Sequence, residues 1–214
     1  MNRPRKGRLI TLEGGEGAGK STNVRVVEKT LRSAGVNFVS TREPGGTQLA
    51  ETLRGILLNP EVDVPPYPEL LMIFAARFDH VEKVIVPALN AGRWVICDRF
   101  VDASFAYQGG GRGLPWEHIR TLERWLPNLA RPALTLLLDV PPGKGLKRAT
   151  RSREADRFER ENAEFYQRIR EAYLKRAARG RRYRVINAAE PRRKVGEQVR
   201  EAVLELLQRT GVSK

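Results

Sequence analysis

The stretch Gly14-Gly15-Glu16-Gly17-Ala18-Gly19-Lys20-Ser21 decides the fold of this chain. It matches the pattern G-x-x-x-x-G-K-[ST] in full, in which a glycine-rich loop wraps the phosphates of a nucleoside triphosphate. Glycines let backbone N–H groups turn toward phosphate oxygens, and a helix that opens after the loop adds positive potential. We expect Lys20 to reach the β- and γ-phosphates and the Ser21 hydroxyl to bind Mg²⁺. A chance glycine-rich turn is the alternative, and the strand before the loop and the helix after it argue against it.

Outside this loop, short apolar runs alternate with segments of helical spacing. The apolar runs end in polar or glycine residues, as strands do at a carboxyl edge: Leu9–Leu12, Phe38–Ser40, Trp94–Cys97, Leu134–Leu138 and Val185–Ile186. The helical segments are Lys20–Ala34, Leu49–Leu58, Glu69–Ala91, Phe158–Ala178 and Val195–Leu207. This alternation predicts a three-layer α/β fold, a mainly parallel sheet of about five strands with helices on both faces.

Proline and glycine mark two interruptions in this pattern. Pro87 predicts a bend or a restart near the end of the segment Glu69–Ala91, because proline removes a helical hydrogen bond. The run Gly109–Gly113 predicts a flexible loop and is too short to separate domains. We therefore expect one domain over residues 1–214.

The composition excludes several classes of protein. The 214 residues carry 39 Lys and Arg against 25 Asp and Glu, a net charge of +14, which indicates anionic partners such as nucleotides or nucleic acid. We favour a solvated basic surface over nucleic-acid binding because no nucleic-acid-binding motif accompanies the charge. Cys97 is the one cysteine, so a disulfide framework and a cysteine-based zinc site are excluded, and the cytoplasm is the expected location. No apolar run is long enough for a membrane span or a signal peptide.

Charged residues follow the predicted strands. Asp98 and Arg99 come directly after Trp94–Cys97, where an acid in this kind of fold holds Mg²⁺ and an arginine can clamp a phosphate. A surface ion pair is the alternative. Asp139 ends another strand, but Pro141 and Pro142 follow, which favours a structural role in a turn.

An arginine-rich segment lies between the fourth strand and the next helix. Arg148, Arg151, Arg153 and Arg157 are interleaved with Glu154 and Asp156. This density is typical of a mobile lid, at about residues 148–160, that closes over a transferring phosphate, because the guanidinium plane meets several phosphate oxygens at once. A solvated helix with ion pairs has the same composition, and both interpretations stay open.

The loop indicates a nucleoside triphosphate without naming the reaction. The chain lacks the Asn-Lys-x-Asp segment with which a GTPase reads its base, and its length suits a small kinase better than a motor ATPase. Phe74 and Arg77 fall on one predicted helix, as core and surface residues or as residues that stack on and bond to a base. Spacing alone favours the core for Phe74.

Taken together, these segments resemble bacterial thymidylate kinases over nearly the whole chain, from about Leu9 to the last helix. The similar segments are Leu12–Thr22, Thr41–Thr47, Phe74–Arg77, Asp98–Phe100, Ser104, Ala106–Gly109, Leu138–Val140 and Gly145–Arg148. The Arg-Glu-Pro-Gly-Gly and Asp-Arg-aromatic segments together with the loop are far more specific than any one of them.

The resemblance implies a reaction and a set of roles. The reaction is transfer of the γ-phosphoryl group of ATP, with Mg²⁺, to dTMP, which gives dTDP and ADP for dTTP synthesis. ATP would be bound by Gly14, Gly15, Glu16, Gly17, Ala18, Gly19, Lys20, Ser21, Thr22 and Arg148, and Mg²⁺ by Ser21 and Asp98. The acceptor would be bound by Glu43, Arg54, Phe74, Arg77, Arg99, Ser104, Tyr107 and Gln108.

The family also implies where catalysis takes place. Lys20, Arg99 and Glu16 would act in catalysis together with an arginine of the lid, Arg151 or Arg153, because the loop itself has no arginine between Gly14 and Gly19. Many members place a thymine-stacking phenylalanine four residues before the equivalent of Arg77. Here that position is Ile73, and Phe74 lies three before.

Family resemblance further suggests a homodimer, formed through helix faces such as Glu69–Ala91, and no membrane partner. Three other functions stay open: a kinase for another monophosphate or a deoxynucleoside, a nucleic-acid-binding ATPase, and a regulatory nucleotide binder.

Overall fold

In the part of the chain that the structure describes, five strands form one sheet in which every neighbouring pair is parallel. The computed structural model describes residues 6–149, 157–158 and 161–211. The strands are β1 (Leu9–Glu13), β2 (Phe38–Arg42), β3 (Trp94–Asp98), β4 (Leu134–Asp139) and β5 (Tyr183–Asn187). Their order across the sheet is β2-β3-β1-β4-β5, which places β1 in the centre. The predicted parallel five-stranded sheet is confirmed.

The three central strands are buried along nearly their whole length, because helices cover both faces of the sheet. Ile10 lies beside Ile96 on one side and Leu134 on the other. Thr11 and Thr135 share a buried position on neighbouring strands, and their hydroxyl oxygens are 2.9 Å apart. Each hydroxyl therefore supplies the hydrogen-bond partner that the other needs in the core.

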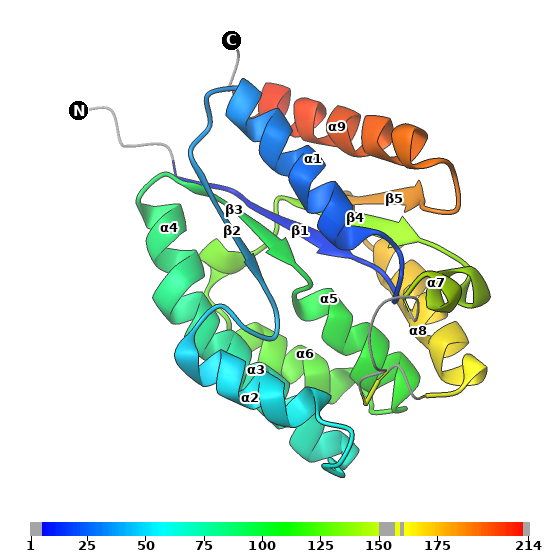
Figure 1. The fold of residues 1–214 in the computed structure, drawn as a ribbon. Helices are drawn as coiled ribbons and strands as arrows, with labels where there is room; N and C mark the ends of the chain where they lie inside the picture. The colour runs from blue at the N-terminus through cyan, green and yellow to red at the C-terminus, as the bar shows by residue number, and fades with distance from the viewer. Residues whose placement is uncertain (1–5, 150–156, 159–160, 212–214) are drawn as a thin grey trace.

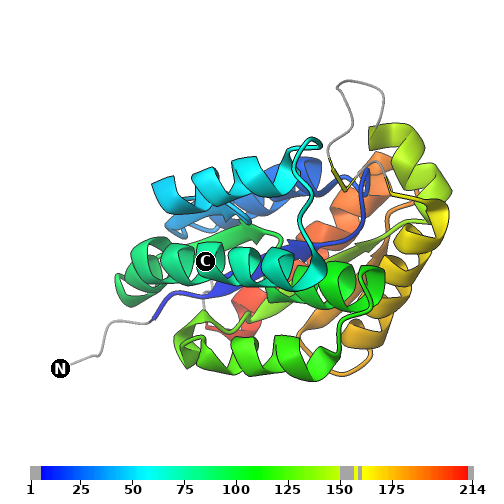
Figure 2. The same ribbon diagram turned by 90° about the horizontal axis from the view of Figure 1, so that it is seen from below.

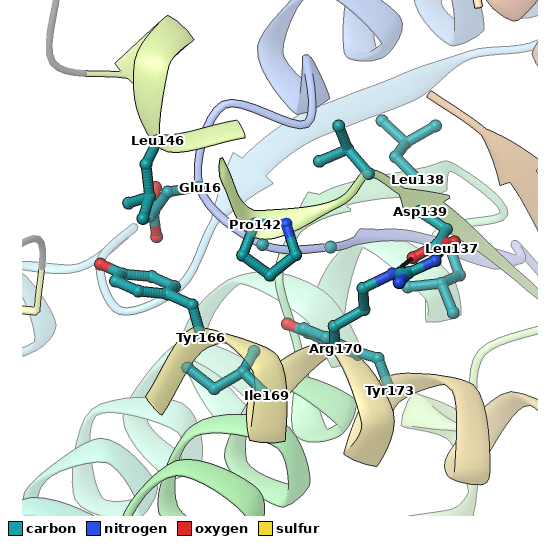
Figure 3. Close-up of a pocket in the computed structure, with 13 residues that line it drawn as sticks. Glu16, Leu137, Leu138, Asp139, Pro142, Leu146, Tyr166, Ile169, Arg170 and Tyr173 are labelled. Atoms are coloured by element: carbon teal, nitrogen blue, oxygen red, sulfur yellow. Dashed lines mark hydrogen bonds and ion pairs between the residues drawn. The ribbon is translucent and has the colours of Figure 1, made fainter. Parts of the chain in front are cut away.

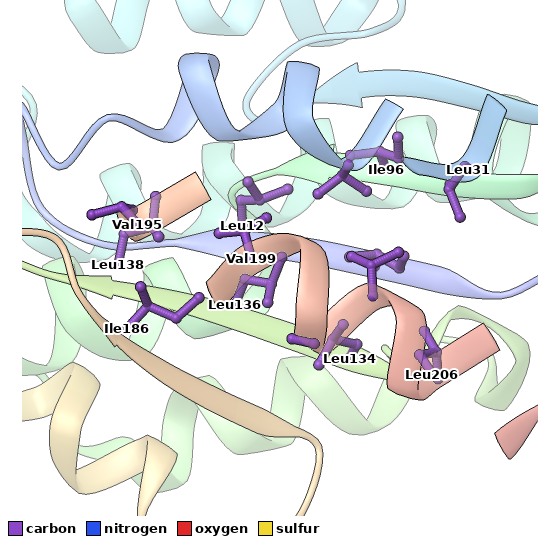
Figure 4. Close-up of a cluster of buried hydrophobic side chains, with 14 of the residues drawn as sticks. Leu12, Leu31, Ile96, Leu134, Leu136, Leu138, Ile186, Val195, Val199 and Leu206 are labelled. Atoms are coloured by element: carbon purple, nitrogen blue, oxygen red, sulfur yellow. The ribbon is translucent and has the colours of Figure 1, made fainter. Parts of the chain in front are cut away.

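Two helices cover one face of the sheet, α1 (Lys20–Ser33) and α9 (Arg192–Arg209) (Figure 1). Between them and the strands lies an apolar cluster in which Leu12 and Ile96 of the sheet meet Leu31 of α1 and Val199 of α9 (Figure 4). Because α1 begins where the phosphate-binding loop ends, this packing fixes the loop relative to the sheet.

The opposite face is covered by the helices between β2 and β4 and by α8 (Figure 2). These are α2 (Gln48–Leu58), α3 (Pro66–His80), η1 (Val81–Ile85), α4 (Val86–Asn90), α5 (Val101–Ser104), η2 (Phe105–Gly111), α6 (Trp116–Trp125), η3 (Asn128–Ala130) and α8 (Ala163–Ala177). Leu9, Val95 and Cys97 of the sheet pack against Phe74 and Phe105 on this side. The short helix α7 (Pro142–Ala149) follows β4 and lies beside the phosphate-binding loop (Figure 1). In the described part of the chain, no helix combines the length and the apolar character needed to cross a bilayer.

The predicted helix over Glu69–Ala91 is interrupted as Pro87 indicated. It forms α3, one π-helical stretch η1, and α4, which restarts one residue before Pro87. The N–H of Val86 bonds to the carbonyl of Val81, five residues back, and Pro87 has no N–H to donate. The wider π-helical turn thus accommodates Pro87, which would disrupt a regular α-helix.

The flexible loop predicted for Gly109–Gly113 was wrong in its first part. Residues to Gly111 belong to the π-helical stretch η2, which packs against α8. A Cβ atom on Gly110 would lie 2.7 Å from the carbonyl oxygen of Arg168, and one on Gly111 would lie 2.5 Å from the Phe165 ring. These glycines are therefore present because α8 approaches the backbone closely, a reason that local sequence does not reveal.

Candidate active site

The phosphate-binding loop joins the central strand β1 to α1 and lies at the carboxyl edge of the sheet, where parallel sheets bind their ligands (Figure 1). Gly17 has a positive φ of 65°, and a Cβ there would lie 1.9 Å from the carbonyl oxygen of Gly145 in α7. Glycine is thus required at this position both by the backbone turn and by the neighbouring helix.

One cavity, of about 760 Å³, runs along the loop, and we call it the loop cavity. Its lining combines the loop with residues from the ends of β2, β3, α7 and α9: Glu16, Gly17, Ala18, Gly19, Lys20, Ser21, Thr22, Asn23, Arg42, Glu43, Arg54, Asp98, Arg99, Arg148, Ala188, Glu190, Arg192 and Val195. Apart from Gly14 and Gly15, every residue predicted to bind ATP is in this lining.

A second cavity, of about 130 Å³, extends inward between α2, α3 and η2, and we call it the inner cavity. It is lined by Glu16, Glu43, Pro44, Arg54, Leu57, Leu58, Ile73, Arg77, Arg99, Ala103, Ser104, Tyr107, Gln108 and Phe158. Glu16, Glu43, Arg54 and Arg99 line both cavities, so the two meet at two arginines and two carboxylates.

Lys20 and Asp98 both line the loop cavity. The Lys20 Nζ donates to the carbonyl oxygens of Gly14 at 3.2 Å and Gly15 at 2.9 Å. Burial lowers the pKa of Lys20, and the Arg99 cation lowers it further. Within the described residues, the buried Oδ1 of Asp98 has no hydrogen-bond partner. This unpaired carboxylate oxygen and the Ser21 hydroxyl belong to one cavity lining and are oxygen ligands of the kind that Mg²⁺ prefers, so these residues fit the predicted ion.

Arg99 stands where the two cavities meet. Its φ is 66°, in the left-handed region that a residue with a side chain rarely adopts. The backbone is held there by a 2.9 Å bond from Arg99 N to Leu12 O, and the guanidinium donates to Gly14 O at 3.0 Å and to Glu16 at 2.5 Å. Tyr107 also donates to Glu16, at 2.8 Å. The strained backbone thus aims a guanidinium group at the junction.

Arg77 is 2% exposed and is fixed from three sides within the inner cavity. It donates to Glu43 at 2.7 Å, to Ser104 Oγ at 3.0 Å and to the Phe100 carbonyl at 3.1 Å. The other Glu43 oxygen lies 3.0 Å from His80 Nδ1. This network allows the arginine one orientation, which suits recognition of a flat polar group.

Phe74 lies behind Arg77 rather than in either cavity wall. It is 1% exposed in the core, and the guanidinium carbon of Arg77 lies 4.5 Å from its ring centroid. Ile73 lines the inner cavity instead. Adjacent residues of an α-helix differ by about 100° around its axis, so only one of the two can face the cavity.

The remaining predicted residues are divided among three places. Arg54 lines both cavities and donates to Pro44 O at 2.9 Å, while Arg148 lines the loop cavity and donates to Ala188 O at 3.0 Å. Arg151 and Arg153, the predicted lid arginines, lie outside the described residues, as does most of the predicted lid. Gly14 and Gly15 line a third, separate cavity.

This third cavity lies between the loop, the end of β4 and α8 (Figure 3). At about 20 Å³ it has room for one water molecule and not for a nucleotide. On its edge the Arg170 guanidinium points at Asp139 and binds both carboxylate oxygens, at 2.7 and 2.8 Å (Figure 3). Asp139 therefore ties the end of β4 to α8.

One further group, Glu43, His80 and Cys97, is close enough to suggest a metal site. However, His80 lies between Glu43 and the Thr41 hydroxyl, which is 2.7 Å from its Nε2. Both ring nitrogens are thus engaged, and the group orients Glu43 instead of offering ligands.

Comparison with known proteins places this site in a family. The family model described as thymidylate kinase matches residues 12–199. The chain is 49% identical over 199 residues to the thymidylate kinase of Nitrosospira multiformis, covering 92% of this chain and 97% of that protein. It is 53% identical over 184 residues to that of Neisseria meningitidis serogroup C, covering 86% and 89%. The chain belongs to the thymidylate kinase family. The crystal structure of thymidylate kinase from Ehrlichia chaffeensis superposes with a TM-score of 0.74 at 32% identity, covering 95% of this chain and 99% of that one.

In this thymidylate kinase family member, sequence reasoning missed several residues of the site. Leu57, Leu58 and Phe158 line the inner cavity but resemble ordinary helix and loop residues in the sequence. Among the missed residues, Glu13 has the clearest signal in the sequence, because it is an acid at the end of the central strand, directly before the loop. It is fully buried, accepting from Phe100 N at 2.7 Å and from Tyr173 at 3.0 Å.

Glu13 should make stability depend on pH. Burial raises its pKa from the usual 4.5 to about 8, Asp102 adds to the rise, and Arg99 opposes it. Between these values the unfolded chain loses the Glu13 proton while the folded protein keeps it, so stability falls as pH rises from 4.5 to 8. Relative to Glu13→Gln, the wild type should lose roughly 4 kcal/mol across this window.

Chemical denaturation of both proteins, without nucleotide, from pH 5 to pH 9 measures this difference. Glutamine keeps partners for Phe100 N and Tyr173 but does not titrate, so it is the matched control. A difference in stability that stays constant over this range would mean that Glu13 is ionised in the folded protein.

Proposed function

We propose that this chain transfers the γ-phosphoryl group of ATP to dTMP, giving dTDP and ADP, as a step toward dTTP. Family membership and one geometric observation support this proposal: the loop cavity and the inner cavity meet at Glu16, Glu43, Arg54 and Arg99. A phosphoryl group passed from donor to acceptor must cross such a junction, and the arginines there neutralise its charge.

The donor occupies the loop cavity. Backbone N–H groups of the loop and Lys20 hold the β- and γ-phosphates, and Thr22 lies in the same lining. Ser21 and Asp98 would hold Mg²⁺, which supplies charge neutralisation on the phosphates when it is bound. Arg148 is in the same lining, and we assign it to the adenine.

The acceptor occupies the inner cavity. Arg54 and Arg99 hold its phosphate at the junction, and Glu16 faces its sugar and phosphate. Arg77, Ser104 and Gln108 surround the position of the base, and Tyr107 crowds the sugar against a 2′-hydroxyl. Little covalent chemistry is left to the protein, so catalysis consists of alignment and electrostatic stabilisation. A lid arginine, Arg151 or Arg153, would complete the charge neutralisation.

A homodimer is part of the same proposal. Leu49 and Ile56 of α2 and Tyr67 and Leu71 of α3 are 40–57% exposed, and α2 and α3 are packed together. Exposed apolar side chains gathered on two adjacent helices favour burial against a second copy. We also propose a cytoplasmic location, where the single buried Cys97 stays reduced.

Release of ADP from MgATP, with dTMP, dUMP, AMP, GMP, CMP and thymidine each offered as acceptor, tests the reaction. Strong turnover with dTMP and little with AMP, GMP, CMP and thymidine is the expected result. Preference for another acceptor would overturn the roles of Arg77, Gln108 and Tyr107. Hydrolysis that needs DNA or RNA and no acceptor would replace the proposal by a nucleic-acid-linked ATPase, for which the net charge of +14 gives the reason to test.

A further inference from the structure

Glu69, in the first turn of α3, is a fully buried carboxylate that three side chains contact as donors. Gln108 Nε2 donates to its Oε1 at 2.8 Å, Arg112 Nε to its Oε2 at 3.2 Å, and Arg157 NH2 to its Oε2 at 2.5 Å. Glu69 is not among the described residues that line the inner cavity, whereas Gln108 is. Glu69 therefore affects the cavity through the side chains that donate to its carboxylate.

The carboxylate decides which way the Gln108 amide faces. A side-chain amide has one donor end and one acceptor end, and an ionised carboxylate can only accept. The Glu69 carboxylate accepts from two guanidinium groups as well, so the NH₂ end of Gln108 turns to Glu69. No donor in the described part of the chain bonds to Gln108 Oε1, so the acceptor end is left for a ligand in the cavity.

Arg77 supplies the complementary group in the same cavity. Its five N–H donors include three that bond to Glu43, Ser104 and Phe100, which leaves one hydrogen on each terminal nitrogen. The cavity thus offers donors from Arg77 and an acceptor from Gln108. A 4-keto pyrimidine presents the matching edge, an O4 acceptor next to an N3–H donor. A 4-amino pyrimidine presents the reverse, an amino donor next to a bare N3.

The other two partners of Glu69 hold a wall of the cavity in place. Arg157 Nε donates to the carbonyl of Leu57 at 2.9 Å. Leu57 lines the inner cavity, and so does Phe158, which follows Arg157 in the sequence. Arg112 lies between Glu69 and Glu161, with its guanidinium over Phe165. Because the same carboxylate anchors Gln108 and this wall, the position of the amide is set relative to the space that the base fills.

We propose that Glu69 is a positioning residue for acceptor specificity: it holds Gln108 Nε2 so that Oε1 faces the inner cavity, which selects a 4-keto pyrimidine over a 4-amino pyrimidine. This inference rests on the proposed function, because it concerns the base of the same acceptor.

The test is Glu69→Gln, with kcat/KM measured for dTMP and for dCMP. A glutamine at this position has an NH₂ group of its own and can donate to Gln108 Oε1, so the Gln108 amide can turn over. We expect the ratio of kcat/KM for dTMP to that for dCMP to fall roughly 10- to 100-fold. The loss should appear mainly in KM for dTMP, and KM for ATP should stay unchanged.

Two comparisons separate positioning from general damage. Glu161→Gln removes the other carboxylate partner of Arg112 without touching Gln108, and it should keep the wild-type ratio. In a Gln108→Leu background, Glu69→Gln should lower the ratio no further, because its effect passes through that amide. If Glu69→Gln does not fold, Glu69→Asp, which keeps the charge on a side chain one methylene shorter, should lower the ratio by a smaller factor.

Retention of the wild-type ratio within about threefold by a folded Glu69 variant would overturn the inference, even if its activity fell equally on both acceptors. Failure of the proposed function is a different outcome, because it would appear in the wild type as the absence of a preference for dTMP.

Discussion

Replacing Lys20 with alanine is expected to lower kcat by roughly 10³-fold or more. The Nζ of Lys20 is held at the loop by the carbonyl oxygens of Gly14 and Gly15, at 3.2 and 2.9 Å. Its partial desolvation strengthens its attraction to an anion, because a charge interacts more strongly where water is excluded.

The expected loss belongs to the chemical step. Lys20 lines the loop cavity and not the inner cavity, so binding of dTMP, measured by calorimetry without ATP, should remain close to that of the wild type. Lys29→Ala is the matched control, because Lys29 is an exposed lysine of the same helix, outside both cavity linings. Turnover of Lys20→Ala within about tenfold of the wild type would refute the assignment of the loop.

The parts of this site that could be predicted are those that depend on local sequence. The loop follows from its glycines, the strands follow from short apolar runs, and Asp98 and Arg99 follow from their place at the end of such a run. Their convergence follows from the rule that ligands of parallel sheets bind at the carboxyl edge. The sheet in which β1 lies between β3 and β4 brings the loop and Asp98 to that edge, as the alternation of strands and helices indicated.

Other parts could not be predicted because they depend on contacts between distant segments. His80 shows no partner in the sequence, yet it orients Glu43 from 37 residues away. Glu69 sits among apolar residues in the first turn of α3, where an acid is expected simply to favour the helix dipole. Its partners come from η2 and from residue 157, and only the folded chain brings these together.

Ile73 and Phe74 show that a shift of one residue along a helix decides which side chain lines the inner cavity. Ile73 and Phe74 are both apolar and both within one turn of Arg77, so composition could not say which one faces the inner cavity. The structure turns Ile73 to the cavity and Phe74 to the core. With the acceptor base in the inner cavity, as proposed, Ile73 would give it an aliphatic contact in place of aromatic stacking, and more of its recognition would rest on the polar groups of Arg77 and Gln108.

Replacing Arg99 with alanine is expected to lower kcat/KM for dTMP by roughly 10²- to 10⁴-fold, while KM for ATP changes little. Arg99 lines both cavities, donates to Gly14 O and pairs with Glu16. Its guanidinium is thus the cation best placed to follow the phosphoryl group from donor to acceptor. Arg99→Lys should recover little of the loss, because an ammonium group cannot contact the loop carbonyl, Glu16 and a phosphate in one plane.

The backbone at Arg99 provides a way to separate strain from charge. A φ of 66° costs a side-chain-bearing residue about 1 kcal/mol, and glycine adopts it freely. Arg99→Gly should therefore be at least as stable as Arg99→Ala in thermal unfolding, yet equally inactive, if the guanidinium is what the reaction requires. A glycine variant markedly more active than the alanine variant would mean that backbone geometry carries the effect. A collapse of ATP affinity with dTMP binding intact would overturn the assignment of Arg99 to the acceptor, since Arg99 would then serve the donor.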